Sequence, residues 1–76
     1  MLHIVSFHNY TISARSLLVG DGRWSGSYMV CERGERIRNS SEVPIQRSRE
    51  LAESAAILVG IQYVEERLAS AQHETS

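Results

Sequence analysis

The chain has 76 residues and a formal charge of −1, from nine acidic and eight basic side chains. This length allows one domain with a small core, which often needs a disulfide, a metal or self-association for stability. Because one cysteine cannot form an intramolecular disulfide and the three histidines lack zinc-ligand spacing, we expect no metal or cofactor, and self-association remains.

Nothing in the chain suggests a membrane or an export signal. The first ten residues have no basic start and no long apolar stretch, unlike a signal peptide. No segment approaches the roughly 18 apolar residues of a membrane-spanning helix. We therefore expect a cytoplasmic protein with no membrane partner, in which Cys31 stays reduced.

Strand-like patterns fill the first half of the chain. A strand from about Phe7 to Leu17 is predicted, because Tyr10, Ile12 and Ala14 alternate with polar residues and form an inward face. The sequence Gly20-Asp21-Gly22 predicts a turn into a second strand, Arg23 to Arg33. The expected core side of this strand carries Trp24, Gly26, Tyr28, Val30 and Glu32.

A third strand and one long helix complete the predicted fold. Gly34-Glu35 indicates a second hairpin, and Arg36 to Ile45 can return as a third strand, in which Pro44 indicates an edge or a strand end. An irregular excursion is expected around Asn39-Ser40-Ser41. Ser48 is a good N-cap for a helix that runs to about Ala69. The prediction is an α+β domain over residues 1–70, a three-stranded antiparallel sheet (β-β-β-α) packed on the C-terminal helix, with a flexible tail at 71–76.

The predicted helix has two apolar sectors. The broader sector, expected to lie on the sheet, contains Leu51, Ala52, Ala55, Ala56, Leu58, Val59 and Tyr63. The second sector lies nearly opposite and contains Ile57, Ile61, Val64 and Leu68. We expect that one sheet cannot cover both, and each aliphatic side chain left in water would forgo roughly 1.5–3 kcal/mol.

Two coverings of the second sector are possible. The N-terminal segment Leu2 to Val5 could wrap over the helix, or a second copy could cover the sector in a symmetric homodimer. We favour the homodimer, because a two-fold contact lets one patch bury itself against its copy. Ile57, Ile61, Val64 and Leu68 are therefore the predicted dimer or partner interface.

No residue pattern indicates an enzyme. Cys31 lies in mid-strand without a nearby histidine or helix N-terminus, so it is expected to be a packing residue. The helical carboxylates Glu50, Glu53, Glu65 and Glu66 are expected to form a solvated face. We predict no catalytic residues.

An alternative function is nucleic-acid binding. Arg23, Arg33, Arg36 and Arg38 flank the two predicted hairpins, and an arginine-lined sheet with exposed aromatic side chains can stack bases. Against this, Glu32 and Glu35 partly neutralise the arginines, and Trp24 and Tyr28 are needed in a small core.

Short motifs over about residues 7–69 resemble a group of short bacterial proteins of unknown function. These are Tyr10-Thr11-Ile12, Asp21-Gly22-Arg23-Trp24, and a closing helix with Ala52, Ala56, Gly60 and Tyr63-Val64. The resemblance implies a β-β-β-α fold and no activity. The order of elements also resembles small antitoxin-type domains, which bind a partner protein, although architecture alone does not fix function. The sequence thus predicts a non-enzymatic interaction or regulatory module that acts as a homodimer and has a possible protein partner.

Overall fold

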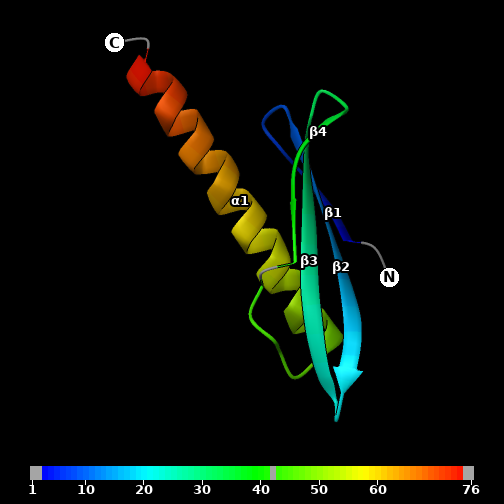
Figure 1. Ribbon diagram of the computed structural model, residues 1–76. Coiled ribbons are helices and arrows are strands. Elements are labelled where there is room, and N and C mark those ends of the chain that lie inside the picture. The colour runs from blue at the N-terminus through cyan, green and yellow to red at the C-terminus, as the bar shows by residue number, and fades with distance from the viewer. Residues whose placement is uncertain (1–2, 42, 75–76) are drawn as a thin grey trace.

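The computed structural model describes residues 3–41 and 43–74, with side chains up to residue 71. Four strands precede one helix: β1 (His3–Phe7), β2 (Tyr10–Gly20), β3 (Arg23–Glu32), β4 (Glu35–Ser40) and α1 (Arg49–Glu74). The strands lie side by side in chain order as an antiparallel sheet, and α1 packs across one face (Figure 1). The predicted α+β class is confirmed, but the sheet has four strands instead of three.

The extra strand arises from a hairpin that the sequence pattern did not reveal. A single strand from Phe7 to Leu17 was the wrong prediction, because the chain reverses at His8-Asn9 and Phe7 pairs with Tyr10. His8 takes a positive φ of 57°, which a two-residue hairpin turn needs at its first position. Of the segment Leu2 to Val5, the described residues belong to β1, an edge strand that does not wrap over the helix, and Leu2 lies outside the described residues.

The other two hairpins have turns of the type I′ pattern. Asp21 and Gly22 have φ of 51° and 73°, and Arg33 and Gly34 have φ of 52° and 85°. Both central positions of a type I′ turn require positive φ, and its twist matches that of the flanking strands. The first turn lies where the sequence predicted it. The second lies one residue earlier than predicted, so Glu35 already belongs to β4.

The segment after β4 is irregular, and the predicted strand to Ile45 is too long. β4 ends at Ser40, and Val43 then turns inward and is buried. Gln46 forms two backbone hydrogen bonds with Trp24, of 2.8 and 2.9 Å. This bridge pairs with the N-terminal part of β3, because β4 pairs with β3 only from Tyr28 onward.

The helix begins as predicted and ends later. The Ser48 hydroxyl accepts a hydrogen bond of 3.2 Å from the Leu51 amide, which confirms the N-cap. Helical structure continues past Ala69 to Glu74, so residues 71–74 of the expected tail are helical and residues 75–76 lie outside the described part. The end of α1 extends away from the sheet (Figure 1). Within the described residues, no helix combines the length and apolar character needed to cross a membrane.

Small residues on α1 allow the helix to approach the sheet closely. Ala52, Ala56 and Gly60 are buried at the centre of the contact. A Cβ atom on Gly60 would lie 2.6 Å from Ile12 Cγ2, and one on Gly26 of β3 would lie 2.5 Å from the Ala52 carbonyl oxygen. Both glycines therefore let the two layers approach more closely than any side chain would permit.

Because the helix axis lies so near the sheet, larger side chains on both flanks reach the core. Ile57 and Val64 are buried, while Ile61 and Leu68 are half-buried and pack against the same cluster. The sheet does not cover both apolar sectors completely, as expected, but the prediction that the second sector would be the uncovered one is wrong. Leu51 and Leu58, predicted to face the sheet, are instead 53% and 60% exposed.

One helical carboxylate departs from its predicted role. Glu53 was expected on a solvated face, but it is buried and accepts a hydrogen bond of 2.7 Å from the Ser16 hydroxyl of β2. Near the other end of the helix, Arg67 Nη2 lies 3.6 Å from Glu32 Oε1. A hydrogen bond to the Tyr10 side chain raises the pKa of Arg67 above its ordinary value.

Candidate functional site

The predicted interface on the helix does not form an open apolar surface. Of its four residues, Ile57 is only 7% exposed and Val64 is fully buried inside the chain. Ile61 and Leu68 keep partial exposure beside the core. A partner can touch only their outer atoms, so the main reason for expecting a helix-mediated dimer is lost.

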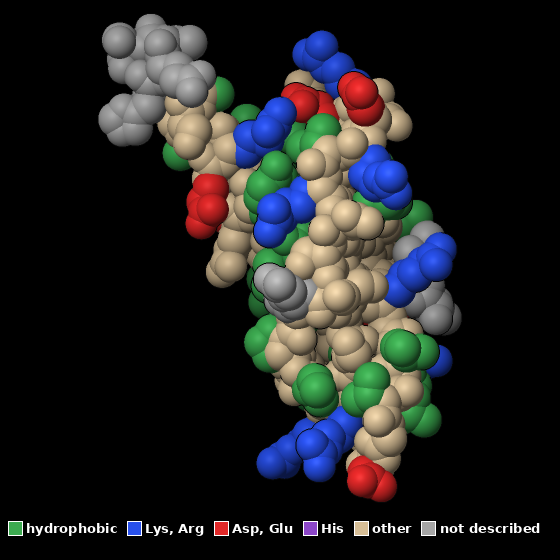
Figure 2. Space-filling model, in the orientation of Figure 1, with side chains coloured by type: hydrophobic (Ala, Val, Ile, Leu, Met, Phe, Trp, Pro, Cys, Tyr) green, Lys and Arg blue, Asp and Glu red, His purple; other side chains and the backbone are tan. Residues whose placement is uncertain are grey.

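The four arginines of the alternative prediction do not form one patch. Arg23 begins β3, whereas Arg33 follows its far end and Arg36 lies beside that end in β4. At about 3.3 Å per residue, the length of β3 separates Arg23 from Arg33 by roughly 30 Å. Arginine side chains accordingly appear at both ends of the molecule (Figure 2).

The aromatic side chains needed for base stacking are buried or half-buried within the chain. Tyr28 is buried against the helix, and its hydroxyl accepts a hydrogen bond of 3.0 Å from Arg38 Nε. The Arg38 guanidinium also lies 5.0 Å from the centre of the Tyr63 ring. Trp24 is half-buried and lies in β3 at the bridge to Gln46. Arg38 therefore serves the contact between helix and sheet, and the arrangement does not favour a stacking platform.

An apolar surface that the sequence did not single out lies at the end of the β2–β3 hairpin. Leu17, Leu18 and Val19 are 68%, 54% and 48% exposed. Leu17 pairs with Ser25 and Leu18 pairs with Trp24, so successive side chains point to opposite faces and both faces are apolar there. Figure 2 shows hydrophobic side chains gathered at this end of the molecule. We call the three residues the hairpin patch.

The hairpin patch is exposed because β2 is longer than the strand beside it. The described part of β1 pairs only as far as Ala14, so the following residues of β2 have no neighbour on that side among the described residues. The register shifts between Leu18 and Gly20, a bulge or similar irregularity at which Val19 has no partner in β3. Bulges discourage continuous edge-to-edge pairing. The patch is therefore suited to side-chain contacts more than to extension of the sheet.

The sheet face opposite the helix is open and carries a regular grid of mostly small polar side chains. One row runs Ile4, Ser13, Met29 and Asn39 across the four strands. In the next row Arg15 lies opposite Ser27. On the other side of the first row lie Ser6, Thr11, Cys31 and Arg36. The sequence placed Thr11, Ser13 and Arg15 on one side of their strand, but it did not show that this side has no covering layer.

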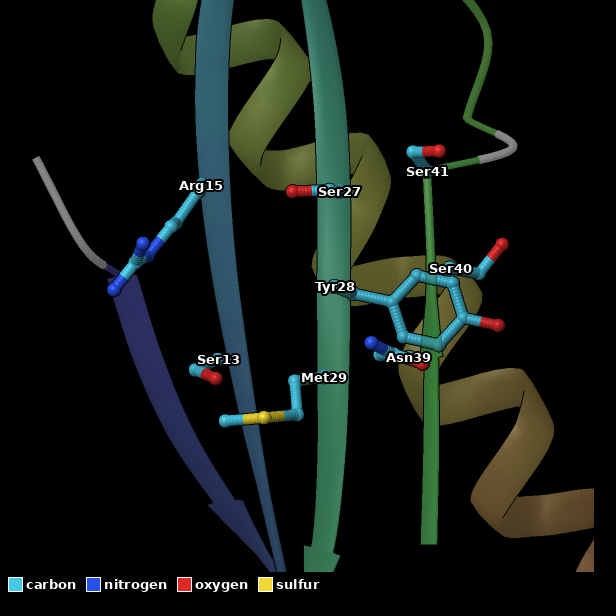
Figure 3. A pocket seen from close by; sticks show the side chains of 8 residues that line it. All are labelled: Ser13, Arg15, Ser27, Tyr28, Met29, Asn39, Ser40 and Ser41. Carbon is cyan, nitrogen blue, oxygen red and sulfur yellow. The ribbon is translucent and has the colours of Figure 1, made fainter. Parts of the chain in front are cut away.

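A hollow of about 560 Å³ lies on the open face (Figure 3). Its lining consists of Ser13, Arg15, Ser27, Tyr28, Met29, Asn39, Ser40 and Ser41. The side chains come from three strands and the segment after β4, with Met29 extending from β3 toward Ser13 of β2 (Figure 3). Hydroxyl, amide and guanidinium groups provide hydrogen-bond donors around one apolar side chain. This chemistry can hold a ligand, but among the described residues no group of three or more His, Cys, Asp or Glu is placed to hold a metal ion.

Comparisons with known proteins identify no relative. No protein-family model, curated protein or solved structure matches the chain. The resemblance to short bacterial proteins therefore stays a prediction.

Proposed function

We propose that the protein is a non-enzymatic interaction module that acts as a homodimer through the hairpin patch. The observation that supports the proposal is the exposure of three consecutive aliphatic residues, 68%, 54% and 48% for Leu17, Leu18 and Val19. An aliphatic side chain gains about 1.5–3 kcal/mol on full burial, so a second copy that covers this patch stabilises a small domain appreciably.

A nearby exposed side chain could enlarge the contact. Ile45 is 56% exposed and is the residue before Gln46, which the backbone bridge holds beside Trp24. A standard interface covers about 800 Å² per subunit, or roughly 15% of the 5489 Å² surface of this chain. That area requires contributions from around the hairpin patch as well as from its three residues.

Leu17 and Leu18 point to opposite faces, so a second copy covers the hairpin patch by packing around the end of the hairpin, and a two-fold arrangement is the simplest way to do this. Apolar side chains carry no charge, so the patch on one copy is complementary to the same patch on another.

The proposal includes a cytoplasmic location, where Cys31 would remain reduced.

Sedimentation velocity of the full chain between 1 and 100 μM (about the range in which weak homodimers dissociate) tests the proposal. We expect the wild-type protein to be dimeric in the upper part of this range and Leu18→Glu to be monomeric throughout. Leu58→Glu is a matched control, because Leu58 is 60% exposed on the outer side of the helix and Leu18 is 54% exposed. The control should dimerise like the wild-type protein.

Three outcomes would contradict the proposed interface. These are a wild-type monomer at all concentrations, a Leu18→Glu dimer of unchanged stability, and equal loss of the dimer in Leu58→Glu. Circular dichroism of both variants separates loss of association from loss of folding. Because each substituted side chain is exposed, we expect changes in unfolding free energy of about 0.5 kcal/mol or less.

A further inference from the structure

The open face of the sheet has an unusual charge distribution for a chain of net charge −1. Arg15 lies on this face opposite Ser27, and Arg36 lies on it opposite Cys31. Of the described acidic residues, Glu32 and Glu53 contact groups on the helix side, Asp21 lies in a turn, and the helix carries Glu50, Glu65, Glu66 and Glu74. Glu35, which pairs with Glu32, shares the helix side of the sheet. The described open face thus carries cations and no carboxylate.

Arg15 forms part of the hollow and is available to a ligand. Its side chain is exposed, and it makes no ion pair with any residue that the structure describes. A guanidinium presents five N–H donors in a fork that matches the oxygens of a phosphate or carboxylate. Ser13, Ser27 and Asn39 add hydroxyl and amide donors from three different strands.

The size and the centre of the hollow suit a small molecule with a compact apolar part. A volume of about 560 Å³ lies within the range of about 300–1,000 Å³ that is typical of small-molecule sites. Met29 lies among the polar side chains and is 36% exposed. A thioether is polarisable and makes favourable contacts with aromatic rings.

We propose that this hollow binds a small organic oxyanion, with the phosphate or carboxylate group at Arg15 and a ring or short apolar body on Met29. The hydroxyls of Ser13 and Ser27 donate to the remaining oxygens of the ligand. Leu17 lies on the same face one row from Arg15, but none of the three hairpin-patch residues lines the hollow, so the proposal does not depend on the homodimer.

The test is a titration of the ¹⁵N-labelled full chain followed by NMR, with phenyl phosphate, benzoate and inorganic phosphate as probes. We expect phenyl phosphate to shift the amide signals of Ser13, Ser27, Met29 and Asn39. Benzoate shows whether a carboxylate can replace the phosphate. Phenyl phosphate should bind at least about threefold more tightly than inorganic phosphate, because only the former contacts Met29.

Arg15→Gln should weaken phenyl phosphate binding about tenfold or more, since it removes charge-assisted hydrogen bonds. Arg36→Gln is the matched control, because it removes the same charge from the same face outside the hollow. The control should change the affinity by less than about twofold. Ser27→Ala tests the hydroxyl contribution without changing any charge.

Several results would overturn the proposal. One is the absence of saturable shifts with both organic probes at millimolar concentration, and another is a set of shifts that lies outside the hollow. An equal loss of affinity in Arg15→Gln and Arg36→Gln would indicate diffuse electrostatic attraction and no site. Equal affinity for inorganic phosphate and phenyl phosphate would remove the role of Met29.

Discussion

Gly26→Ala tests whether the close contact between α1 and the sheet holds this fold together. A Cβ atom on Gly26 would lie 2.5 Å from the Ala52 carbonyl oxygen and 3.4 Å from Val43 Cγ1. Close carbon–oxygen contacts in proteins begin at about 3.3 Å, so the helix or β3 would have to move by about 0.8 Å. The obstructing atom belongs to the backbone, and no side-chain rotation can relieve the contact.

The expected loss follows from two opposing contributions. Alanine in place of glycine in a strand favours folding by about 0.5–1 kcal/mol, because glycine loses more backbone entropy. Overpacking a close contact costs about 1–3 kcal/mol, with the upper end expected where the backbone must shift. We therefore expect Gly26→Ala to lower the free energy of unfolding by about 2 kcal/mol, or the melting temperature by roughly 8–16 °C.

Urea unfolding followed by circular dichroism measures this loss. Ser25→Ala is the control, because Ser25 is the neighbouring residue of β3 and its side chain points to the open face; it should change the unfolding free energy by about 0.5 kcal/mol or less. The loss of unfolding free energy in Gly60→Ala should lie between the losses in these two variants. Its added Cβ meets a side-chain methyl group of Ile12, and alanine stabilises a helix by about 1 kcal/mol relative to glycine. A neutral or stabilising Gly26→Ala would refute the reasoning.

Two further predictions concern a turn and a buried carboxylate. Arg33→Asn should raise the free energy of unfolding by about 0.5–1 kcal/mol, because Arg33 has a φ of 52° and asparagine before Gly34 suits a type I′ turn; urea unfolding that shows no gain would contradict this. Ser16→Ala should lower the free energy of unfolding by about 1–3 kcal/mol, because the variant loses the 2.7 Å hydrogen bond to buried Glu53. Thermal unfolding of Ser16→Ala is compared with that of Ser27→Ala, a control because Ser27 lies on the open face. Equal losses of stability in the two variants would contradict this prediction.

The sequence predicted the parts of the fold that local chemistry determines. Alternation placed Tyr10, Ile12 and Ala14 inward, and the structure buries all three. Ser48 capped the helix and Gly20-Asp21-Gly22 formed a turn, as their backbone preferences require. The sequence did not predict the hairpin at His8-Asn9, because neither residue is a glycine and the strand pattern continues on both sides of the turn.

The helix faces could not be assigned from periodicity alone. The sequence shows which residues share an angle on the helix, but it does not show how closely the sheet approaches. Gly26 and Gly60 bring the two layers so near each other that Ile57 and Val64 reach the core, although periodicity placed both residues on the side of the helix opposite the sheet. Conversely, the exposure of Leu17 and Leu18 depends on the relative lengths of β1 and β2, and the missed hairpin concealed those lengths.

The charge distribution indicates which surface suits which partner. Two copies stacked through their open faces would bury Arg15 and Arg36 of both copies in one contact, with no described carboxylate on either face to pair with them. Such like-charge contacts are unfavourable once they are removed from water. The hairpin patch has no such restriction, because aliphatic side chains are complementary to themselves. The open face is therefore better suited to a small anion than to a second copy, and the hairpin end is better suited to self-association.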